Sequence, residues 1–474
     1  MSVASRPEVL RRADGAVAVG AVAAAGLGVA LALAGAASAN PLLAIAGGLL
    51  AAAGAFTILA AGWVDGALLL ALVLPLPAIY SSETLRISPA LVVTALVVPG
   101  WLLRRTLEGG TLSFGALPRR GTALLGAAVL LAAVFAEAYV PALRELVTFG
   151  LLFGVLLMAA DEVTARPARA HVIAIALAAA AAVSGVCAVL EAGGVLPGRF
   201  PREGSPFYRA AFGFTWPNEL GQYFAFSLPF TVYARSVARG RLARTLATAA
   251  VVSCVLGLAA TFSRGSWVTA LAATATLGLL GEWRLMLRVW AAGLVAILAL
   301  DLVSGGALSG RVASALVDQV AAQRLALQYT GLLIFRAHPV VGIGPGNFEV
   351  GLERYGPQIS WLWDYIGSAH NLYIHMAAET GAIGLIALLA FLGAAFRVLV
   401  RSARSAGAAA AAGAMAGADV ALRRTLAWSF GTVCVAGMFE WPFAHGLGQL
   451  IMLVAGMGCG LAPLTAPRGP ATRG

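Results

Sequence analysis

Residues 170–190 read AHVIAIALAAAAAVSGVCAVL, a stretch of 21 residues without Asp, Glu, Lys or Arg. An α-helix rises about 1.5 Å per residue, so the stretch would be about 31 Å long and would match a hydrocarbon layer of about 30 Å. Backbone polar groups that face lipid have no water to bond, so such a stretch must bond internally as a helix. The sequence therefore predicts a membrane-spanning helix here.

Comparable apolar stretches fill most of the chain, which predicts an all-α, polytopic transmembrane helical bundle with about twelve to fourteen spans. The expected spans are at roughly 16–37, 42–61, 62–80, 88–105, 121–140, 143–160, 170–190, 216–235, 243–262, 266–281, 285–303, 371–396, 425–441 and 447–464.

The composition supports this fold class. Hydrophobic residues make up 60% and charged residues 11% of the sequence, whereas soluble domains average about 45–50% and about 25%. The formal net charge is +11 and all 32 basic residues are arginines, since the sequence has no lysine. Because these arginines alternate with apolar spans, they indicate membrane topology and not nucleic-acid binding. The four cysteines lie in apolar runs without ligand spacing and are expected to be small core residues.

The arginines also predict an orientation in the bacterial inner membrane. Arg6, Arg11 and Arg12 favour a cytoplasmic N-terminus, and counting spans from there places nearly every dense arginine cluster on the same side. The remaining loops, chiefly about 191–215 and about 304–370, are then periplasmic. Three parts are expected: N-terminal spans (1–190), a core with the long periplasmic loop (191–400), and a cytoplasmic linker with C-terminal spans (401–474).

Candidate chemistry gathers at the predicted periplasmic face. His370 precedes a span at the membrane surface, where a histidine can exchange a proton near neutral pH. His375 and Glu379 are four residues apart and share a helix face. The structural alternative is a helix start capped by Asn371, with glycines for close helix contact.

Arg264, in Phe262-Ser263-Arg264-Gly265, would lie between two apolar helices at membrane depth, which favours a functional role over snorkelling to the headgroups. By contrast, the glycines of Arg336-Ala337-His338-Pro339-Val340-Val341-Gly342-Ile343-Gly344-Pro345-Gly346-Asn347-Phe348 favour a structural turn, because no phosphate-loop lysine follows. Further candidates are less distinct. They are Arg199, Arg202, Arg209, Asn218 in Trp216-Pro217-Asn218, Glu440, Trp441 and His445.

Taken together, these stretches resemble the O-antigen ligase and O-antigen polymerase superfamily of bacterial membrane proteins. The resemblance is carried by Phe262-Ser263-Arg264-Gly265, by Arg324 ahead of the glycine-rich turn, by Ala369-His370-Asn371 and by Glu379-Thr380-Gly381 with Gly384. Trp216-Pro217-Asn218 is similar to a softer family element. The resemblance covers about 205–390.

The resemblance implies a glycosyltransferase that moves a glycan from undecaprenyl diphosphate to an acceptor hydroxyl without a metal ion, a nucleotide or another cofactor. It implies that Arg264 and Arg324 bind the diphosphate and that His370 removes or orients the acceptor proton. Arg336 is the alternative to Arg324, and Asn371, Asn218 and Arg209 are further substrate-binding candidates. Lipid A-core is the first choice of acceptor.

Two other functions remain open at this point. The same motifs occur in polymerases of O-antigen, capsule or exopolysaccharide, whose acceptor is another lipid-linked unit. A small-anion transporter, such as a bicarbonate carrier, belongs to a different class and should place polar groups at the membrane midplane. The polar residues predicted here gather at one face, which favours an enzyme.

Overall fold

The computed structural model of the chain describes residues 65–76, 80–81, 86–109, 111–201, 207–303, 305–306, 319–356, 368–443 and 446–462, and the isolated positions Ala24, Leu27, Ala53 and Thr57. The expected spans 16–37 and 42–61 lie outside this part of the chain. The chain divides into two compact units, Met1–Leu70 with Leu91–Leu112, and Ala71–Ala90 with Ser113–Gly474. All candidate site residues belong to the second unit.

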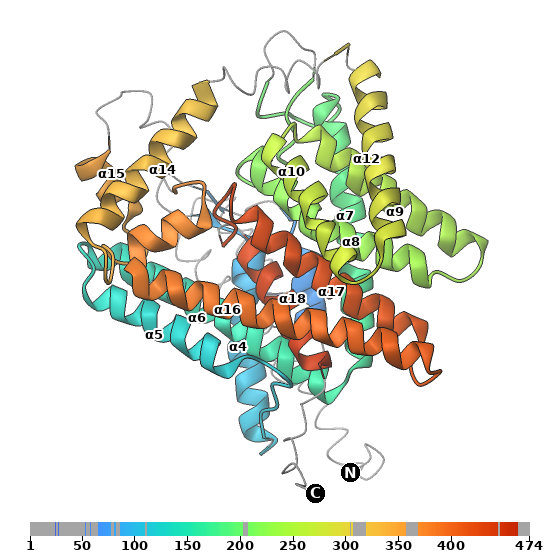
Figure 1. The fold of residues 1–474 in the computed structure, drawn as a ribbon, viewed down its shortest axis with the longest axis horizontal. Coiled ribbons are helices and arrows are strands. Elements are labelled where there is room, and N and C mark those ends of the chain that lie inside the picture. The colour runs from blue at the N-terminus through green and yellow to red at the C-terminus, as the bar shows by residue number, and fades with distance from the viewer. Residues whose placement is uncertain are drawn as a thin grey trace, which may run out of the picture. The chain divides into compact units, whose positions relative to one another are not determined.

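The described residues are mainly helical, as the apolar stretches predicted (Figure 1). The helices are α3 (Gly66–Val73), α4 (Pro89–Leu107), α5 (Arg119–Val134), α6 (Tyr139–Ala165), α7 (Ala168–Ala192), α8 (Pro217–Val237), α9 (Arg241–Ala260), α10 (Arg264–Ala273), α11 (Ala275–Leu279), α12 (Trp283–Val303), α14 (Gln319–Ala337), α15 (Phe348–Tyr355), α16 (Leu372–Ala411), α17 (Gly417–Ala436) and α18 (Leu447–Leu461). The two-residue strands β1 (Tyr80–Ser81) and β2 (Arg86–Ile87) pair antiparallel.

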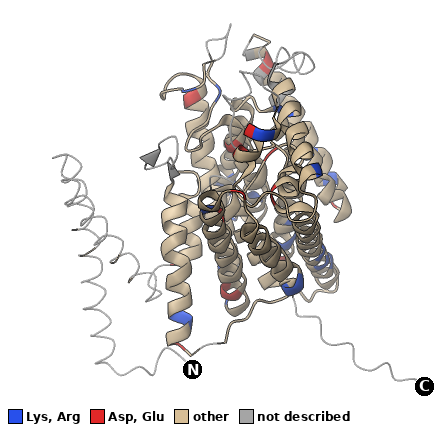
Figure 2. Cartoon of the chain, turned by 90° about the vertical axis from the view of Figure 1, so that its left-hand side faces the viewer, with Lys and Arg blue, Asp and Glu red and all other residues tan. Residues whose placement is uncertain are grey.

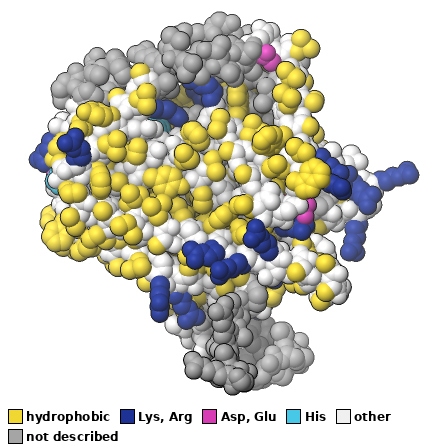
Figure 3. Space-filling view, viewed as in Figure 1, with side chains coloured by type: hydrophobic (Ala, Val, Ile, Leu, Met, Phe, Trp, Pro, Cys, Tyr) yellow, Lys and Arg dark blue, Asp and Glu magenta, His cyan; other side chains and the backbone are white. Residues whose placement is uncertain are grey.

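Five described helices are long and apolar enough to cross a membrane: α4, α6, α7, α9 and α16. Figure 2 shows long stretches of helix without a charged residue, and Figure 3 shows hydrophobic side chains over much of the face in view. In a membrane these side chains would contact lipid. The chain is a multi-pass membrane protein.

Three predicted elements differ in detail. The expected span 266–281 is two short helices, α10 and α11, because the helix is interrupted at Thr274. The expected loop 304–370 contains the 19-residue helix α14 and the shorter α15. The expected cytoplasmic linker after residue 400 is largely helical, because α16 continues to Ala411 and α17 begins at Gly417.

Within the second unit, α16 contacts α5, α14 and α17, and α17 also contacts α8, α10 and α18. Helix α17 therefore lies between the helices that carry the candidate residues. Helix α17 also contacts α11 closely, because a Cβ added at Gly431 of α17 would clash with Thr276 Oγ1 of α11.

Candidate functional site

Four segments that are distant in sequence meet at the helix ends around α17. They are the first turn of α10, helix α14, the turn 368–371 before α16, and residues 437–441 after α17. Leu372 N–H donates to Gly437 O at 2.7 Å, which attaches the start of α16 to the end of α17. A Cβ added at Gly265 would lie 3.4 Å from Phe439 Cβ and 3.8 Å from Arg324 Nη1, so α10 and α14 reach the same place.

Glu440 joins two of the predicted residues, Arg324 and His370. Arg324 Nη2 donates to Glu440 Oε1 at 2.5 Å, and Arg324 Nη1 donates to Phe439 O at 3.3 Å. His370 Nδ1 lies 2.7 Å from the other carboxylate oxygen, Glu440 Oε2. Because an ionised carboxylate only accepts hydrogen bonds, Nδ1 carries the proton and Nε2 of a neutral ring is unprotonated.

The two partners of Glu440 determine its charge. Burial alone would raise the pKa of this carboxyl, but the adjacent His370 and Arg324 outweigh burial and hold its pKa below the ordinary value. Glu440 is therefore an anion at neutral pH. It orients the His370 ring, whose Nε2 makes no hydrogen bond to any described residue and can accept a proton.

His370 also has an unusual backbone conformation, with φ of 46°. Non-glycine residues rarely adopt this left-handed region, and such strain is found at functional sites. Ser368 Oγ accepts the His370 N–H, and the following residue, Asn371, caps α16 by accepting the N–H groups of Tyr373 and Ile374. Asn371 Nδ2 also donates to Met438 O at 3.2 Å. The described contacts of Asn371 therefore fit the cap that the sequence suggested.

Arg264 is the first residue of α10 and is half-buried. Ser263 caps this helix, since its Oγ accepts the Ser266 N–H. Phe262, two residues before Arg264, has a φ of 50°. Phe262 and His370 are the non-glycine residues with positive φ in the described chain, and each lies within two residues of a predicted site residue.

Arg209 and Asn218 form a second group beside α10. Arg209 Nη2 donates to Asn218 Oδ1 at 3.1 Å, and Arg209 Nε donates to Thr261 O at 3.2 Å. Ser266 Oγ in turn donates to Asn218 O at 3.3 Å. The first turn of α10 thus contacts both groups, so the structure brings Arg209, Asn218, Arg264, Arg324, His370 and Asn371 into one region.

Residues 249–389 match the family model described as O-antigen ligase. This segment belongs to the O-antigen ligase family. It includes Arg264, Arg324 and His370, as the resemblance in the sequence implied. No curated protein matches the chain. The match supports a membrane glycosyltransferase of the ligase and polymerase type.

The glycine-rich turn of the O-antigen ligase domain is attached to α16 through its backbone. Helix α16 is broken at Gly381, where φ is 63°. The N–H groups of Ile343 and Gly344 donate to the carbonyls of Ala378 and Glu379, while Ala382 and Ile383 donate to Pro339 and Val340. A Cβ at Gly342 would lie 2.3 Å from the Glu379 backbone, so only glycine fits there. These contacts support the interpretation of the glycine-rich stretch as a structural turn.

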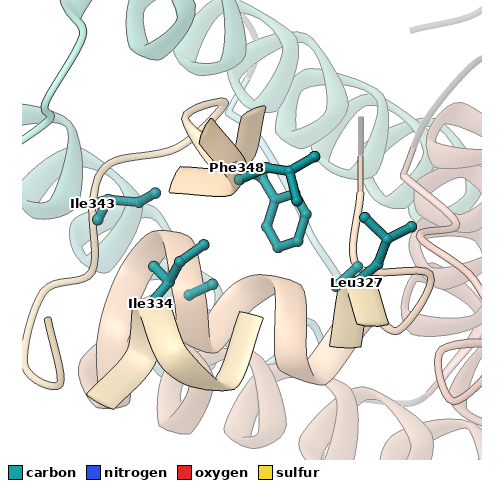
Figure 4. Close-up of a cluster of buried hydrophobic side chains, with 7 residues drawn as sticks. Leu327, Ile334, Ile343 and Phe348 are labelled. Carbon is teal, nitrogen blue, oxygen red and sulfur yellow. The ribbon is translucent and has the colours of Figure 1, made fainter. Parts of the chain in front are cut away.

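Glu379 holds the other end of the same turn. Its carboxylate accepts the N–H groups of Gly346 and Phe348, both at 2.9 Å, and it is 2% exposed. Figure 4 shows Ile343 and Phe348 directed toward Leu327 and Ile334 of α14, with which they form a buried hydrophobic cluster. The turn therefore fixes α14, and with it Arg324, against α16.

Arg336 does not join the cluster. It lies twelve residues after Arg324 on α14, about 18 Å along the helix axis, and its side chain is exposed. Arg199 donates to the carbonyls of Phe214 and Ala211 and so holds the loop before α8. Arg202 and His445 lie outside the described residues.

Glu440 is the residue that sequence reasoning did not single out. The sequence offers Glu440 only among the less distinct candidates, together with Trp441 and His445. It lies 70 residues after His370 and outside the O-antigen ligase segment, so no local spacing connects the two. The available signal was its position next to Trp441 at the end of an apolar span.

Proposed function

We propose that the chain transfers a glycan from undecaprenyl diphosphate to a hydroxyl group of lipid A-core at the periplasmic face of the inner membrane. The acceptor oxygen attacks the anomeric carbon, and its proton passes to Nε2 of His370. The bond from the anomeric carbon to the diphosphate oxygen breaks, and undecaprenyl diphosphate leaves with the bonding electrons.

The observation that carries this proposal is the bridge from Arg324 through Glu440 to His370. A base must have a free nitrogen, and Glu440 holds His370 by Nδ1 so that Nε2 is available. The same carboxylate orients Arg324. Two of the five guanidinium N–H groups are used in this way, so others remain for a ligand.

Arg264 and Arg324 would bind the leaving group. The diphosphate gains negative charge as the glycosidic bond breaks, and fixed cations in a partly dry site stabilise that charge. Guanidinium groups suit this task because they bind phosphate oxygens in pairs. In this proposal the two arginines supply the positive charge that a divalent cation supplies in other transferases.

Arg209 and Asn218 would extend the site toward the glycan or the lipid carrier. Asn218 orients Arg209 through its Oδ1 atom, while the Asn218 carbonyl accepts from Ser266 of the α10 first turn. We assign this pair to substrate binding and not to proton transfer, because neither side chain is a base near neutral pH.

The position of the cluster favours transfer over anion transport. Arg264 begins α10, His370 precedes α16 and Glu440 follows α17, so the charged groups lie at helix ends. A transporter of the alternative class should place them near the middle of the spanning helices.

The glycolipid profile of a deletion strain tests the proposal. Loss of the ligase should leave free lipid A-core and long glycan chains stranded on the carrier, and wild-type protein should restore the normal profile. Lipid A-core with a single repeat unit would instead indicate a polymerase. An unchanged lipopolysaccharide profile would reject this acceptor and direct the search to glycoproteins, exopolysaccharide and finally bicarbonate uptake.

A further inference from the structure

His375 is a buried histidine that the proposed reaction does not use. It lies on the first turns of α16, five residues after His370, and is 3% exposed. A buried histidine is often only a core residue, so its contacts must decide whether it does more. They come from four separate parts of the chain.

One ring nitrogen of His375 contacts the residue before His370. Ala369 N–H donates to His375 Nδ1 at 3.4 Å. Nδ1 is therefore the unprotonated nitrogen of a neutral ring, and Nε2–H lies 3.3 Å from Glu379 Oε2. The ring thus links the turn that carries His370 to the carboxylate that holds the glycine-rich turn.

The faces of the ring contact two aromatic residues. The ring centroid of Trp441 lies 4.1 Å from that of His375. The ring centroid of Phe348, the first residue of α15, lies 5.0 Å from it. Trp441 directly follows Glu440. His375 therefore contacts the neighbour of each residue in the His370–Glu440 pair, Ala369 on one side and Trp441 on the other.

This arrangement bears on a strained and distance-sensitive pair. A non-glycine residue with positive φ is strained and persists only where its surroundings fix it. The 2.7 Å separation of His370 Nδ1 and Glu440 Oε2 requires both backbone segments to be in place. Through its two flanking contacts, His375 can fix both at once.

We infer that His375 is a positioning residue that holds His370 and Glu440 together and couples them, through Glu379, to the glycine-rich turn. The inference rests on the proposed glycan transfer. His375 touches no reacting atom, so its effect should appear in turnover and not in donor affinity.

Three substitutions separate the contacts. His375→Phe keeps a ring for Trp441 and Phe348 but loses both nitrogens. His375→Asn places an amide oxygen near the Nδ1 position, where it can accept from Ala369. His375→Gln reaches toward Glu379 instead. His171→Phe is the matched control, because the partners of His171 are Tyr233 and Asp419 and no residue of the cluster.

Transfer of a glycan from undecaprenyl diphosphate should be measured with the full chain in membranes, at equal protein levels. We expect kcat of His375→Phe to fall roughly 10–100-fold with KM for the donor unchanged, because a misplacement of about 1 Å can cost about 10²-fold. His375→Asn should recover most of this loss, His375→Gln little of it, and His171→Phe should stay close to the wild type.

Two results would overturn the inference. One is wild-type kcat in His375→Phe. The other is equal activity of the Asn and Gln variants, which also decides the matter if the Phe variant does not accumulate. Failure of the proposed function is distinguishable, since the wild type itself would then transfer no glycan.

Discussion

Among the described residues, His370 and His171 form the two shortest contacts between a histidine and a carboxylate, and only His370 has the properties of a reactive group. His370 Nδ1 lies 2.7 Å from Glu440 Oε2, and His171 Nε2 lies 2.9 Å from Asp419 Oδ1. The two histidines differ in the contacts of the second ring nitrogen. His171 Nδ1 is bonded to Tyr233 Oη, whereas His370 Nε2 has no bond to a described residue.

The surroundings of the two pairs differ as well. The His171 pair joins α7, α8 and α17, and among the described residues no arginine forms a hydrogen bond with it. Glu440 also binds Arg324, close to the α10 turn that carries Arg264. A histidine and a carboxylate thus suffice to tie helices together. A reaction site additionally needs an open nitrogen and nearby cations for the leaving group.

Replacing each histidine by alanine should give the largest contrast. His370→Ala should lower glycan transfer by about 10²–10⁴-fold, the usual contribution of a general base. His171→Ala should retain most of the activity and lose thermal stability instead. Complementation of the deletion strain at matched membrane levels measures the transfer activity of both variants. Equal activity of the two variants would remove the distinction between the pairs.

A smaller contrast is expected between two arginines of the same helix. Arg324→Gln should reduce kcat by about 10²–10³-fold, because it removes a fixed cation from the leaving group. Arg336→Gln should have little effect, since Arg336 is exposed and about 18 Å along α14. Rates in membranes containing each variant test this, and the reverse order would make Arg336 the diphosphate ligand.

Replacing the carboxylates of Glu440 and Asp419 should give a smaller difference in transfer rate. Glu440→Gln should reduce transfer roughly 10–100-fold, because a hydrogen bond to a charged group contributes about 1.5–3 kcal/mol. Asp419→Asn should change the rate little, because Asp419 bonds His171 and neither Arg324 nor His370. Size-exclusion chromatography in detergent is the control, because a loss of folding would also lower the transfer rate. Both variants must be monodisperse before their rates are compared.

The smallest expected effect is on the pH dependence of stability. Glu440 has a depressed pKa in the folded protein, so its contribution to stability is present above its ordinary value of 4.5 and is lost as pH falls through the lower folded value. The difference in Tm between wild type and Glu440→Gln should therefore stay constant down to about pH 4.5 and narrow below it. Narrowing already between about pH 7 and 5 would contradict the assigned ionisation of Glu440.

The sequence predicted the fold class because apolar length alone determines which segments can cross a membrane. The roles of Arg264, Arg324 and His370 stay a prediction from the resemblance to a family, and these three residues lie in the segment that matches it. The sequence did not predict the break between α10 and α11, since the apolar run continues through Thr274.

Glu440 shows why part of the site could not be found in this way. Its bonds to Arg324 and His370 span 116 and 70 positions of the sequence. They depend on α17 lying between α10 and α16, and helix contacts of this kind leave no local spacing pattern. Arg336 shows a second limitation. Arg324 and Arg336 look equivalent in the sequence, but α14 places them about 18 Å apart along its axis.

The central claim is that arginines and a carboxylate-held histidine transfer a glycan from a lipid diphosphate. Purified wild-type protein and His370→Ala should be incubated in EDTA with an undecaprenyl-diphosphate-linked glycan and lipid A-core. Wild type should yield glycosylated lipid A-core and free undecaprenyl diphosphate, and His370→Ala should yield little of either. Equal transfer by the two proteins, or wild-type transfer that requires an added divalent cation, would contradict it.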